Sequence, residues 1–382
     1  MYSVLDYGRM LSDPVRTNAY AESLRRAVRP GSVVVDIGTG SGIFALLACR
    51  CGARKVYAIE PEDIIQVARE IAAANHCADR IEFIQDRSTR VTLPERADVI
   101  VSDLRGILPW FDHHLAAIAD ARRRFLRPGG TLVPQRDTLW AALVEAADVY
   151  DDLVRPWSED QYGFDLRPVR SLGLNTWLKA RIKVEQFLSP AQCWATLDYT
   201  AVEDVNVCRE GTWTAVRGGA CHGFAVWFDT VLADGVGFSN SPAGPQAIYG
   251  TVFFPWMEPV TLDPGDKVSL RIEAKIVGED YIWNWDTCVF DGGATPSIKA
   301  SFKQSTFFEA PLSPKRLRRR AADYTPALDE EGQIDHFILG LMDGQHSLGE
   351  IARRAADRFP KQLDKWETAL ARVSEVSRKY SP

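Results

Sequence analysis

The sequence lacks the features of a membrane-spanning or secreted protein. No apolar run approaches the roughly 18 residues that a transmembrane helix needs. The N-terminus, MYSVLDYGRM, has no basic stretch followed by a hydrophobic one, so we expect no secretory signal. The seven cysteines are scattered and never form C-x-x-C pairs, which is typical of a reducing compartment and of a chain without a zinc site. We therefore expect a cytoplasmic protein with no membrane partner and no bound metal.

The chain also lacks an excess of positive charge. Its formal net charge is −6, whereas a protein that binds nucleic acid in bulk favours a basic surface. We interpret the one basic run, residues 315–320, as a solvated linker rather than an anion site. An apolar fraction of 46% and a charged fraction of 25% fit a soluble globular protein. At 382 residues the chain is long enough for two or three domains.

Strands alternate with helices in the first third of the chain. We predict strands at residues 33–35, 55–60, 80–85 and 97–102, and helices at 43–50, 61–75 and 113–126. The last of these helices is closed by the turn Arg-Pro-Gly-Gly at 127–130. Such alternation implies right-handed β-α-β units and a parallel sheet. Residues 1–134 are therefore expected to form an α/β, Rossmann-like, doubly wound domain behind an N-terminal helix.

The remainder of the chain has a different pattern. Short aromatic and β-branched runs separated by turns predict an antiparallel β-barrel or sandwich over residues 135–310. The runs are 179–184, 193–199, 223–231, 247–254, 267–276 and 281–290. Amphipathic helices at 334–341, 348–359 and 366–376 predict a third, small α-rich unit over residues 322–382.

A glycine-rich turn follows the first predicted strand. Residues 33–42 read V-V-V-D-I-G-T-G-S-G, and glycines at a strand end let the backbone approach a ligand at a helix N-terminus. In dinucleotide enzymes such a turn holds a pyrophosphate, but an Asp two residues before the first glycine suits S-adenosylmethionine. Glu60, at the end of the next strand, can accept bonds from both ribose hydroxyls. The predicted cofactor residues are Asp36, Gly38, Thr39, Gly40, Gly42 and Glu60, with Asp86 and Ser88 after the third strand.

At this point the chain resembles the protein arginine methyltransferases. Residues 10–17, M-L-S-D-P-V-R-T, are similar to that family's M-L-x-D-x-x-R-T entry helix. Residues 162–165, Y-G-F-D, resemble the lead into its dimerisation arm, and 223–229 resemble a strand of its barrel. Residues 238–242 with 251–254 resemble the strand pair around its substrate loop. The resemblance covers about residues 2–300. It implies a homodimer, and it implies that Arg16 pairs with the carboxylate of the cofactor.

The sequence departs from this family in the active-site loop. The family reads S-E-x-M-G with a second Glu beyond it, and the two carboxylates clamp the substrate guanidinium. Here residues 102–106 read S-D-L-R-G, so the carboxylates would be Asp103 and Asp112, and Arg105 replaces the methionine. The family's T-H-W motif maps onto Gln-Ala-Ile at 246–248. The candidate catalytic residues are therefore Asp103, Asp112 and Arg105.

Two hypotheses for this loop remain open. In the first, Asp103 and Asp112 grip a guanidinium or another amine, with Arg105 turned away. In the second, Arg105 pairs with Asp103 or with a substrate carboxylate, and the acceptor is a different group. The neighbouring His113 and His114 are expected to form a solvated helix start rather than to act as bases.

The C-terminal unit resembles a PqqD-type winged-helix module that binds peptides. The resemblance lies in I-L-G-L-M-D-G at 338–344 and S-L-G-E-I-A at 347–352. It implies capture of the leader of a precursor peptide by strand addition to a small sheet, as in natural-product tailoring. A helical packing unit without a ligand remains the open alternative. DNA binding is disfavoured because acidic residues offset the arginines of the second helix.

Two functions from different classes follow. The first is an S-adenosylmethionine-dependent methyltransferase that acts on an amine, guanidine or other nucleophile of a peptide or small metabolite. The second is a non-catalytic peptide-binding scaffold derived from a methyltransferase.

Overall fold

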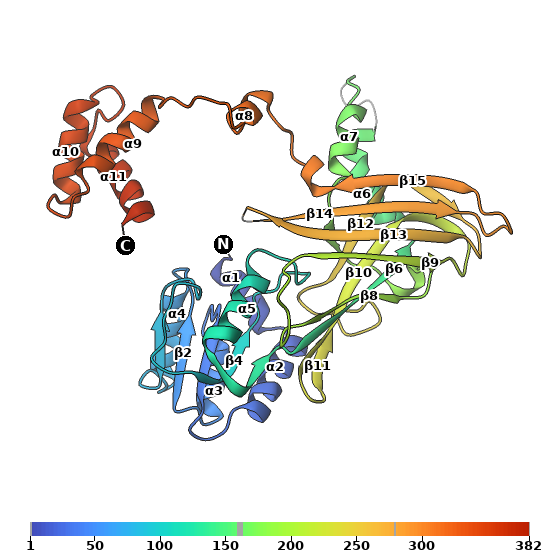
Figure 1. The fold of residues 1–382 in the computed structure, drawn as a ribbon, viewed down its shortest axis with the longest axis horizontal. Coiled ribbons are helices and arrows are strands. Elements are labelled where there is room, and N and C mark those ends of the chain that lie inside the picture. The colour runs from blue at the N-terminus through green and yellow to red at the C-terminus, as the bar shows by residue number, and fades with distance from the viewer. Residues whose placement is uncertain (1, 159–162, 279, 382) are drawn as a thin grey trace. The chain divides into compact units, whose positions relative to one another are not determined.

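The computed structural model describes residues 2–158, 163–278 and 280–381, which divide into two compact units, Met1–Pro311 and Leu312–Pro382 (Figure 1). Both sheet regions predicted from the sequence lie in the first unit. The boundary that we expect near residue 134 stays a prediction. In the described residues, no helix is both long and apolar enough to span a membrane.

The N-terminal part of the first unit is a five-stranded parallel sheet in the order β3-β2-β1-β4-β5. Every residue of β1 is buried, as expected for a parallel sheet covered by helices on its faces. The strands are β1 Val33–Ile37, β2 Lys55–Ile59, β3 Ile81–Ile84, β4 Ala97–Ser102 and β5 Leu126–Val133. The helices are α1 Val4–Leu11, α2 Pro14–Ala27, α3 Ile43–Arg50, α4 Ile65–Ala74 and α5 His114–Arg124. The predicted doubly wound α/β architecture is confirmed.

Strand β5 corrects the sequence analysis, which read residues 127–130 as a turn that closes a helix. The helix ends at Arg124, and β5 pairs with β4 in parallel. The register jumps from Ala97↔Leu126 to Val99↔Thr131, so residues 127–130 bulge out of a continuing strand. The Arg-Pro-Gly-Gly composition correctly predicts an irregular backbone at the bulge. It gives no sign that the strand continues on either side of it.

The second half of this unit contains two antiparallel sheets. The six-stranded sheet has the order β7-β12-β10-β6-β8, with β11 paired to β10, and the four-stranded sheet has the order β15-β14-β13-β9. The strands of the larger sheet are β6 Arg136–Val144, β7 Leu178–Ala180, β8 Gln192–Asp198, β10 Gly219–Ala233, β11 Val236–Ser239 and β12 Thr251–Leu262. The strands of the smaller sheet are β9 Val207–Thr214, β13 Lys267–Val277, β14 Asp280–Phe290 and β15 Ile298–Ser305. Single-turn helices, η1 Val184–Gln186 and η2 Thr306–Phe308, flank them.

The antiparallel prediction is confirmed, although several strand limits were wrong. The sequence analysis missed β6, β9 and β15. It also predicted a strand at 247–254, whereas residues 247–250 form a turn and the strand, β12, spans Thr251–Leu262. Stacked aromatic rings fill the core, with Phe224 and Phe254 4.8 Å apart. At the bulge in β10, a side chain on Gly223 would meet the carbonyl oxygen of Phe254 at 2.0 Å, so only glycine fits.

Two helices, α6 Ala147–Ser158 and α7 Arg167–Gly173, lie between β6 and β7. Their buried Tyr150, Val154 and Leu174 join a small core of their own with Trp227 and Phe253 of the larger sheet. This is the segment expected to carry the dimerisation arm. Of the Y-G-F-D motif, Tyr162 lies outside the described residues, and the ring of Phe164 is exposed.

The C-terminal unit is helical. Its elements are α8 Pro314–Arg318, α9 Glu330–Leu341, α10 Leu348–Arg358 and α11 Trp366–Tyr380. The last three share a core that includes Ile338, Ile351 and Val373, and a capping box between Ser347 and Glu350 starts α10. The three predicted helices are present, but residues 312–381 contain no strand. The winged-helix description, which needs a small sheet, is therefore not supported.

Candidate functional site

The candidate site lies at the carboxyl edge of the parallel sheet. The glycine turn follows β1, Glu60 follows β2, and Asp103 follows β4. These three strands are neighbours, and parallel strands deliver the residues that follow them to the same edge. The fold therefore brings together residues that are far apart in the sequence.

The glycines of the turn adopt conformations and contacts that other residues cannot. Gly38, Gly40 and Gly42 have φ angles of 69°, 52° and 84°. A Cβ atom on Gly38 would lie 2.2 Å from the side chain of Leu104, and one on Gly40 would lie 2.5 Å from the ring of Tyr7. The turn is thus a cradle that requires glycine at these positions.

Asp36 lies beneath this turn and is fully buried. Its Oδ2 accepts a hydrogen bond of 2.6 Å from the hydroxyl of Thr39, whereas its Oδ1 has no partner among the described residues. Burial raises the pKa of Asp36 to about 7. A buried carboxylate oxygen without a partner is costly, so this atom is suited to meet a cationic or hydrogen-bonding ligand.

Glu60 ties the turn to the end of β2. Its two oxygens accept hydrogen bonds from the backbone N–H groups of Gly40, at 3.0 Å, and Glu62, at 3.1 Å. Beyond it, a cavity of about 320 Å³ lies between α1 and the start of α4, lined by Tyr2, Tyr7, Glu62 and Ile64 among others. Of the residues predicted after β3, Asp86 is half-buried and Ser88 is buried.

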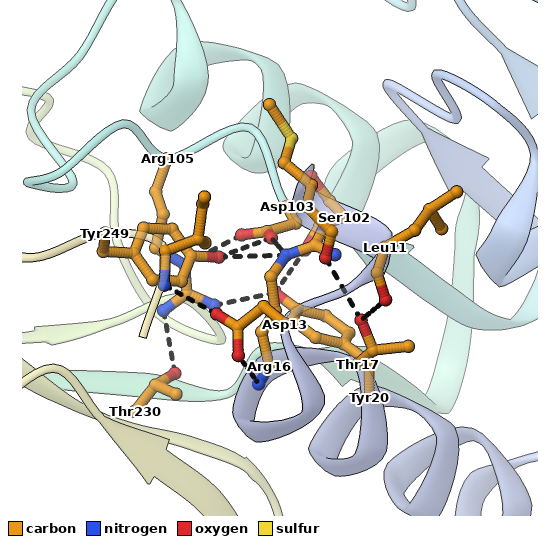
Figure 2. A network of polar contacts seen from close by, with 12 residues as sticks. Leu11, Asp13, Arg16, Thr17, Tyr20, Ser102, Asp103, Arg105, Thr230 and Tyr249 are labelled. Atoms are coloured by element: carbon orange, nitrogen blue, oxygen red, sulfur yellow. Dashed lines mark hydrogen bonds and ion pairs between the residues drawn. The ribbon is translucent and has the colours of Figure 1, made fainter. Parts of the chain in front are cut away.

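Arg16 and Tyr249 both contact Asp103 (Figure 2). The Nε of Arg16 and the hydroxyl of Tyr249 each donate to Oδ2 of Asp103 at 2.5 Å. In the described part of the chain, the side-chain hydrogen bonds of Arg16 both start from Nε. The two terminal nitrogens of Arg16 make none of these hydrogen bonds.

Arg105 has its own set of partners, of which Figure 2 labels Tyr20, Asp103 and Thr230, and its side chain is 0% exposed. The guanidinium donates to Asp137 at 2.7 Å, Thr230 at 2.8 Å, the hydroxyl of Tyr20 at 2.7 Å and Asp103 at 3.2 Å. It also lies over the rings of Phe228 and Phe238, at 5.1 and 5.7 Å from their centroids. Arg105 is thus held as an internal cation.

Of the two hypotheses for the loop, these contacts favour the second. Arg105 is not turned away: its buried guanidinium contacts Asp103. Burial alone would raise the pKa of Asp103, but the guanidiniums of Arg16 and Arg105 outweigh it and hold that pKa below its ordinary value. Asp103 is an anion that two internal guanidiniums already contact, and one of them, Arg105, also pairs with Asp137.

Asp112 does not join Asp103 in a clamp. Its side chain is 65% exposed, its φ angle is 46°, and the nearest basic group is Nε2 of His113, 3.9 Å away. His114 departs from the expected solvated helix start because it is buried and lies 3.3 Å from the hydroxyl of Tyr199. Burial, with the nearby charge of Arg105, lowers the pKa of His114 to about 3, so it stays neutral.

The sequence analysis missed most partners of Arg105. Tyr20 lies one helical turn after Arg16 on α2, and a shared helix face could have suggested it. Asp137 is the one acid in strand β6 and is fully buried, and Tyr199 donates to its other oxygen at 2.6 Å. An isolated buried charge in a strand implies a hidden partner, and this signal was available.

We expect Arg105→Met to destabilise the fold by about 3–5 kcal/mol, because it leaves the buried Asp137 without its cation. Urea unfolding monitored by circular dichroism measures this loss. The double variant Arg105→Met/Asp137→Asn should recover part of it, since the unpaired charge is then removed. A single variant as stable as the wild type contradicts the network.

Two family models match the chain. Residues 16–134 match the ribosomal protein L11 methyltransferase family, and residues 135–283 match the arginine methyltransferase oligomerization subdomain. Neither match extends into the C-terminal unit.

Similar proteins agree with these matches. Protein arginine N-methyltransferase 1 of Dictyostelium discoideum is 29% identical over 248 residues, which are 63% of this chain and 72% of that protein. Protein arginine N-methyltransferase 1 of Schizosaccharomyces pombe is 28% identical over 277 residues, 70% of this chain and 80% of the relative.

Solved structures show the same fold. Arabidopsis thaliana protein arginine methyltransferase 10 superposes with a TM-score of 0.70 at 22% identity, covering 79% of this chain and 97% of that one. A Trypanosoma brucei PRMT1 enzyme–prozyme heterotetramer with AdoHcy gives 0.71 at 22% identity, covering 78% and 97%. The chain is therefore a methyltransferase that uses S-adenosyl-L-methionine, built on the fold of the protein arginine methyltransferases.

Proposed function

We propose that the chain methylates an amine or another neutral nucleophile of a peptide or small metabolite, and not a guanidinium held by Asp103. The observation that carries this proposal is the buried Arg105. An internal guanidinium already contacts the carboxylate that would clamp a substrate arginine. A substrate cation would have to compete with a partner that is covalently part of the loop.

The residues at the sheet edge fit S-adenosylmethionine. The glycine cradle allows close backbone approach, and the orphaned oxygen of Asp36 can accept a bond from the cofactor's amino group. Glu60 can bind the ribose, and the terminal nitrogens of Arg16 can bind the carboxylate. We propose Gly38, Thr39, Gly40 and Gly42, with Asp86 and Ser88 after β3, as the rest of the binding set.

The chemistry asks little of the protein beyond positioning. When bound, S-adenosylmethionine supplies a methyl group that its sulfonium already activates. Among the described residues, the side chains near Asp103 hold no strong base, because Asp103 is kept ionised by two guanidiniums and His114 is buried with a lowered pKa. A neutral acceptor, or one that gives its proton to water, suits such a site.

The competing proposal is a non-catalytic scaffold that keeps the fold. The pairing of Asp103 with Arg16 and Arg105 favours this scaffold, because it leaves no carboxylate clamp for a substrate. Transfer of a labelled methyl group to any peptide or metabolite acceptor eliminates it.

The C-terminal unit bears on the acceptor class. We retain peptide binding, and with it natural-product tailoring, as a hypothesis for this unit. Its described residues offer helices and no sheet edge, so a peptide would have to lie against helix faces rather than add a strand. The faces of α9, α10 and α11 that expose Leu339, Leu348 and Trp366 are the surfaces to test.

We also propose that the chain forms a homodimer through α6 and α7. These helices occupy the position of the family's arm, and the match to the oligomerization subdomain includes them. Phe164 and Val169 expose apolar side chains there, as expected of an interface.

Glu60→Gln should weaken the binding of S-adenosylhomocysteine by about tenfold, because hydrogen bonds to a charged group contribute about 1.5–3 kcal/mol. Isothermal titration calorimetry measures the change. Glu70→Gln, an exposed acid on α4, is the matched control and should bind like the wild type. If the wild type itself gives no binding, the proposed function fails.

The affinity for S-adenosylhomocysteine should rise as the pH rises from about 5.5 to 7.5. With a pKa of about 7 in the free protein, Asp36 carries a proton at the lower pH, and a cationic amino group favours its ionised form. Because only one proton is linked to binding, the affinity can change by at most about tenfold per pH unit. Asp36→Asn should bind more weakly and without this slope, whereas a flat wild-type profile contradicts the role of Asp36.

Light scattering should give twice the chain mass of 42.6 kDa. The double variant Phe164→Glu/Val169→Glu should give a monomer, because buried charges disfavour the interface. Ile298→Glu, at an equally exposed apolar residue on β15, serves as the control and should remain a dimer. A wild-type monomer rules out the proposed dimer.

A further inference from the structure

A cavity of about 470 Å³ lies beside the candidate site, on the side of the smaller antiparallel sheet. Its walls come from the loop after Asp103, the start of β7, the start of β14, and η2. The lining residues are Trp110, Phe111, Asp112, Thr176, Trp177, Asp280, Tyr281, Trp283, Thr306 and Glu309. The volume falls in the range of small-molecule sites.

Half of the lining residues are aromatic, and their rings face different directions. Trp283 meets Trp110 at 6.1 Å with an interplanar angle of 86°, and it meets Trp177 at 6.3 Å with an angle of 70°. Trp110 and Trp283 are buried, and the hydroxyl of Tyr281 donates to the carbonyl oxygen of Val205 at 2.6 Å. The rings are therefore fixed as the walls of a box.

The charged groups that line the box are all acidic. Asp112, Asp280 and Glu309 have exposed side chains, and the ten lining residues include no lysine, arginine or histidine. This contrasts with Asp103, whose charge is matched by Arg16 and Arg105. Aromatic faces and exposed carboxylates both attract an organic cation.

The box is joined to the active-site loop through Phe111. A Cβ atom on Gly106 would lie 2.8 Å from the ring of Phe111, so the aromatic wall packs directly on the residue after Arg105. Asp112, the second carboxylate predicted from the sequence, lines this box instead of pairing with Asp103. A group bound here therefore lies next to the loop that carries Asp103 and Arg105.

We propose that this box binds an organic cation of side-chain size, an alkylammonium or a guanidinium, which belongs to the acceptor substrate. It is a recognition subsite and not the place of transfer, because aromatic faces and carboxylates stabilise the charged form whereas the methyl acceptor must be neutral. The assignment to the substrate rests on the proposed function. The binding of a cation to the box can be measured whether or not the proposed function is correct.

The test uses the full chain labelled with 5-fluorotryptophan and followed by fluorine NMR. The resonances of Trp110 and Trp177 are assigned from the Trp110→Phe and Trp177→Phe variants. Three probes are titrated: choline, methylguanidinium, and 3,3-dimethylbutan-1-ol, which has the shape of choline without its charge. Choline should shift these two resonances in a saturable way, and the neutral probe should bind at least about tenfold more weakly. Comparison of the affinities for methylguanidinium and choline tells whether the box prefers a guanidinium or an ammonium group.

The carboxylates are tested by the double variant Asp112→Asn/Glu309→Gln, which should weaken choline binding at least about fivefold. The control variant Asp234→Asn/Glu258→Gln removes two exposed acids elsewhere and should bind choline like the wild type. Both variants should bind S-adenosylhomocysteine normally, which shows that they are folded.

Equal binding of choline and its neutral analogue overturns the proposal, as does the absence of saturable shifts in a protein that binds S-adenosylhomocysteine. Loss of S-adenosylhomocysteine binding with intact choline binding instead defeats the proposed function and leaves the cation box standing.

Discussion

The burial of the Arg105 guanidinium is the constraint on which the rest of the site depends. Removing such a charge from water costs several kcal/mol, and the cost is offset only if its hydrogen bonds are satisfied. Four elements supply these partners: Tyr20 from α2, Asp103 after β4, Asp137 from β6 and Thr230 from β10. The network therefore connects the parallel sheet to the larger antiparallel sheet, and it fixes the active-site loop between them.

This arrangement separates two tasks that a pair of acids would otherwise share. Asp103 accepts hydrogen bonds from groups within the protein: the guanidiniums of Arg16 and Arg105 and the hydroxyl of Tyr249. Asp112 keeps its charge exposed and faces an aromatic box. Glu60 takes no part in this network, because its oxygens accept from the backbone of Gly40 and Glu62, and the glycine cradle meets the active-site loop only through the packing of Gly38 on Leu104 among the described residues. A methyltransferase fold can thus retain its cofactor edge while its acceptor side is rebuilt.

The sequence predicted those parts of the molecule that depend on local patterns. The parallel strands, the glycine turn and the acid at the end of β2 follow from spacing and from the periodicity of buried residues. The strand β5 was hidden because its central bulge has the composition of a turn. Most partners of Arg105 could not be found in this way, since a residue such as Thr230 lies 125 residues away in the chain. Long-range polar contacts leave no periodic trace, and their local signs here are the helix face that Tyr20 shares with Arg16 and the isolated acid Asp137.

The measurement that tests the central claim most directly is the identity of the methylated atom. Full-length protein is incubated with labelled S-adenosylmethionine and an equal mixture of peptides that carry either an accessible arginine or a primary amine in place of arginine. Tandem mass spectrometry then locates the label. The account predicts no methylarginine, because Arg105 already holds Asp103. Label on a guanidinium nitrogen of the arginine peptide would contradict it.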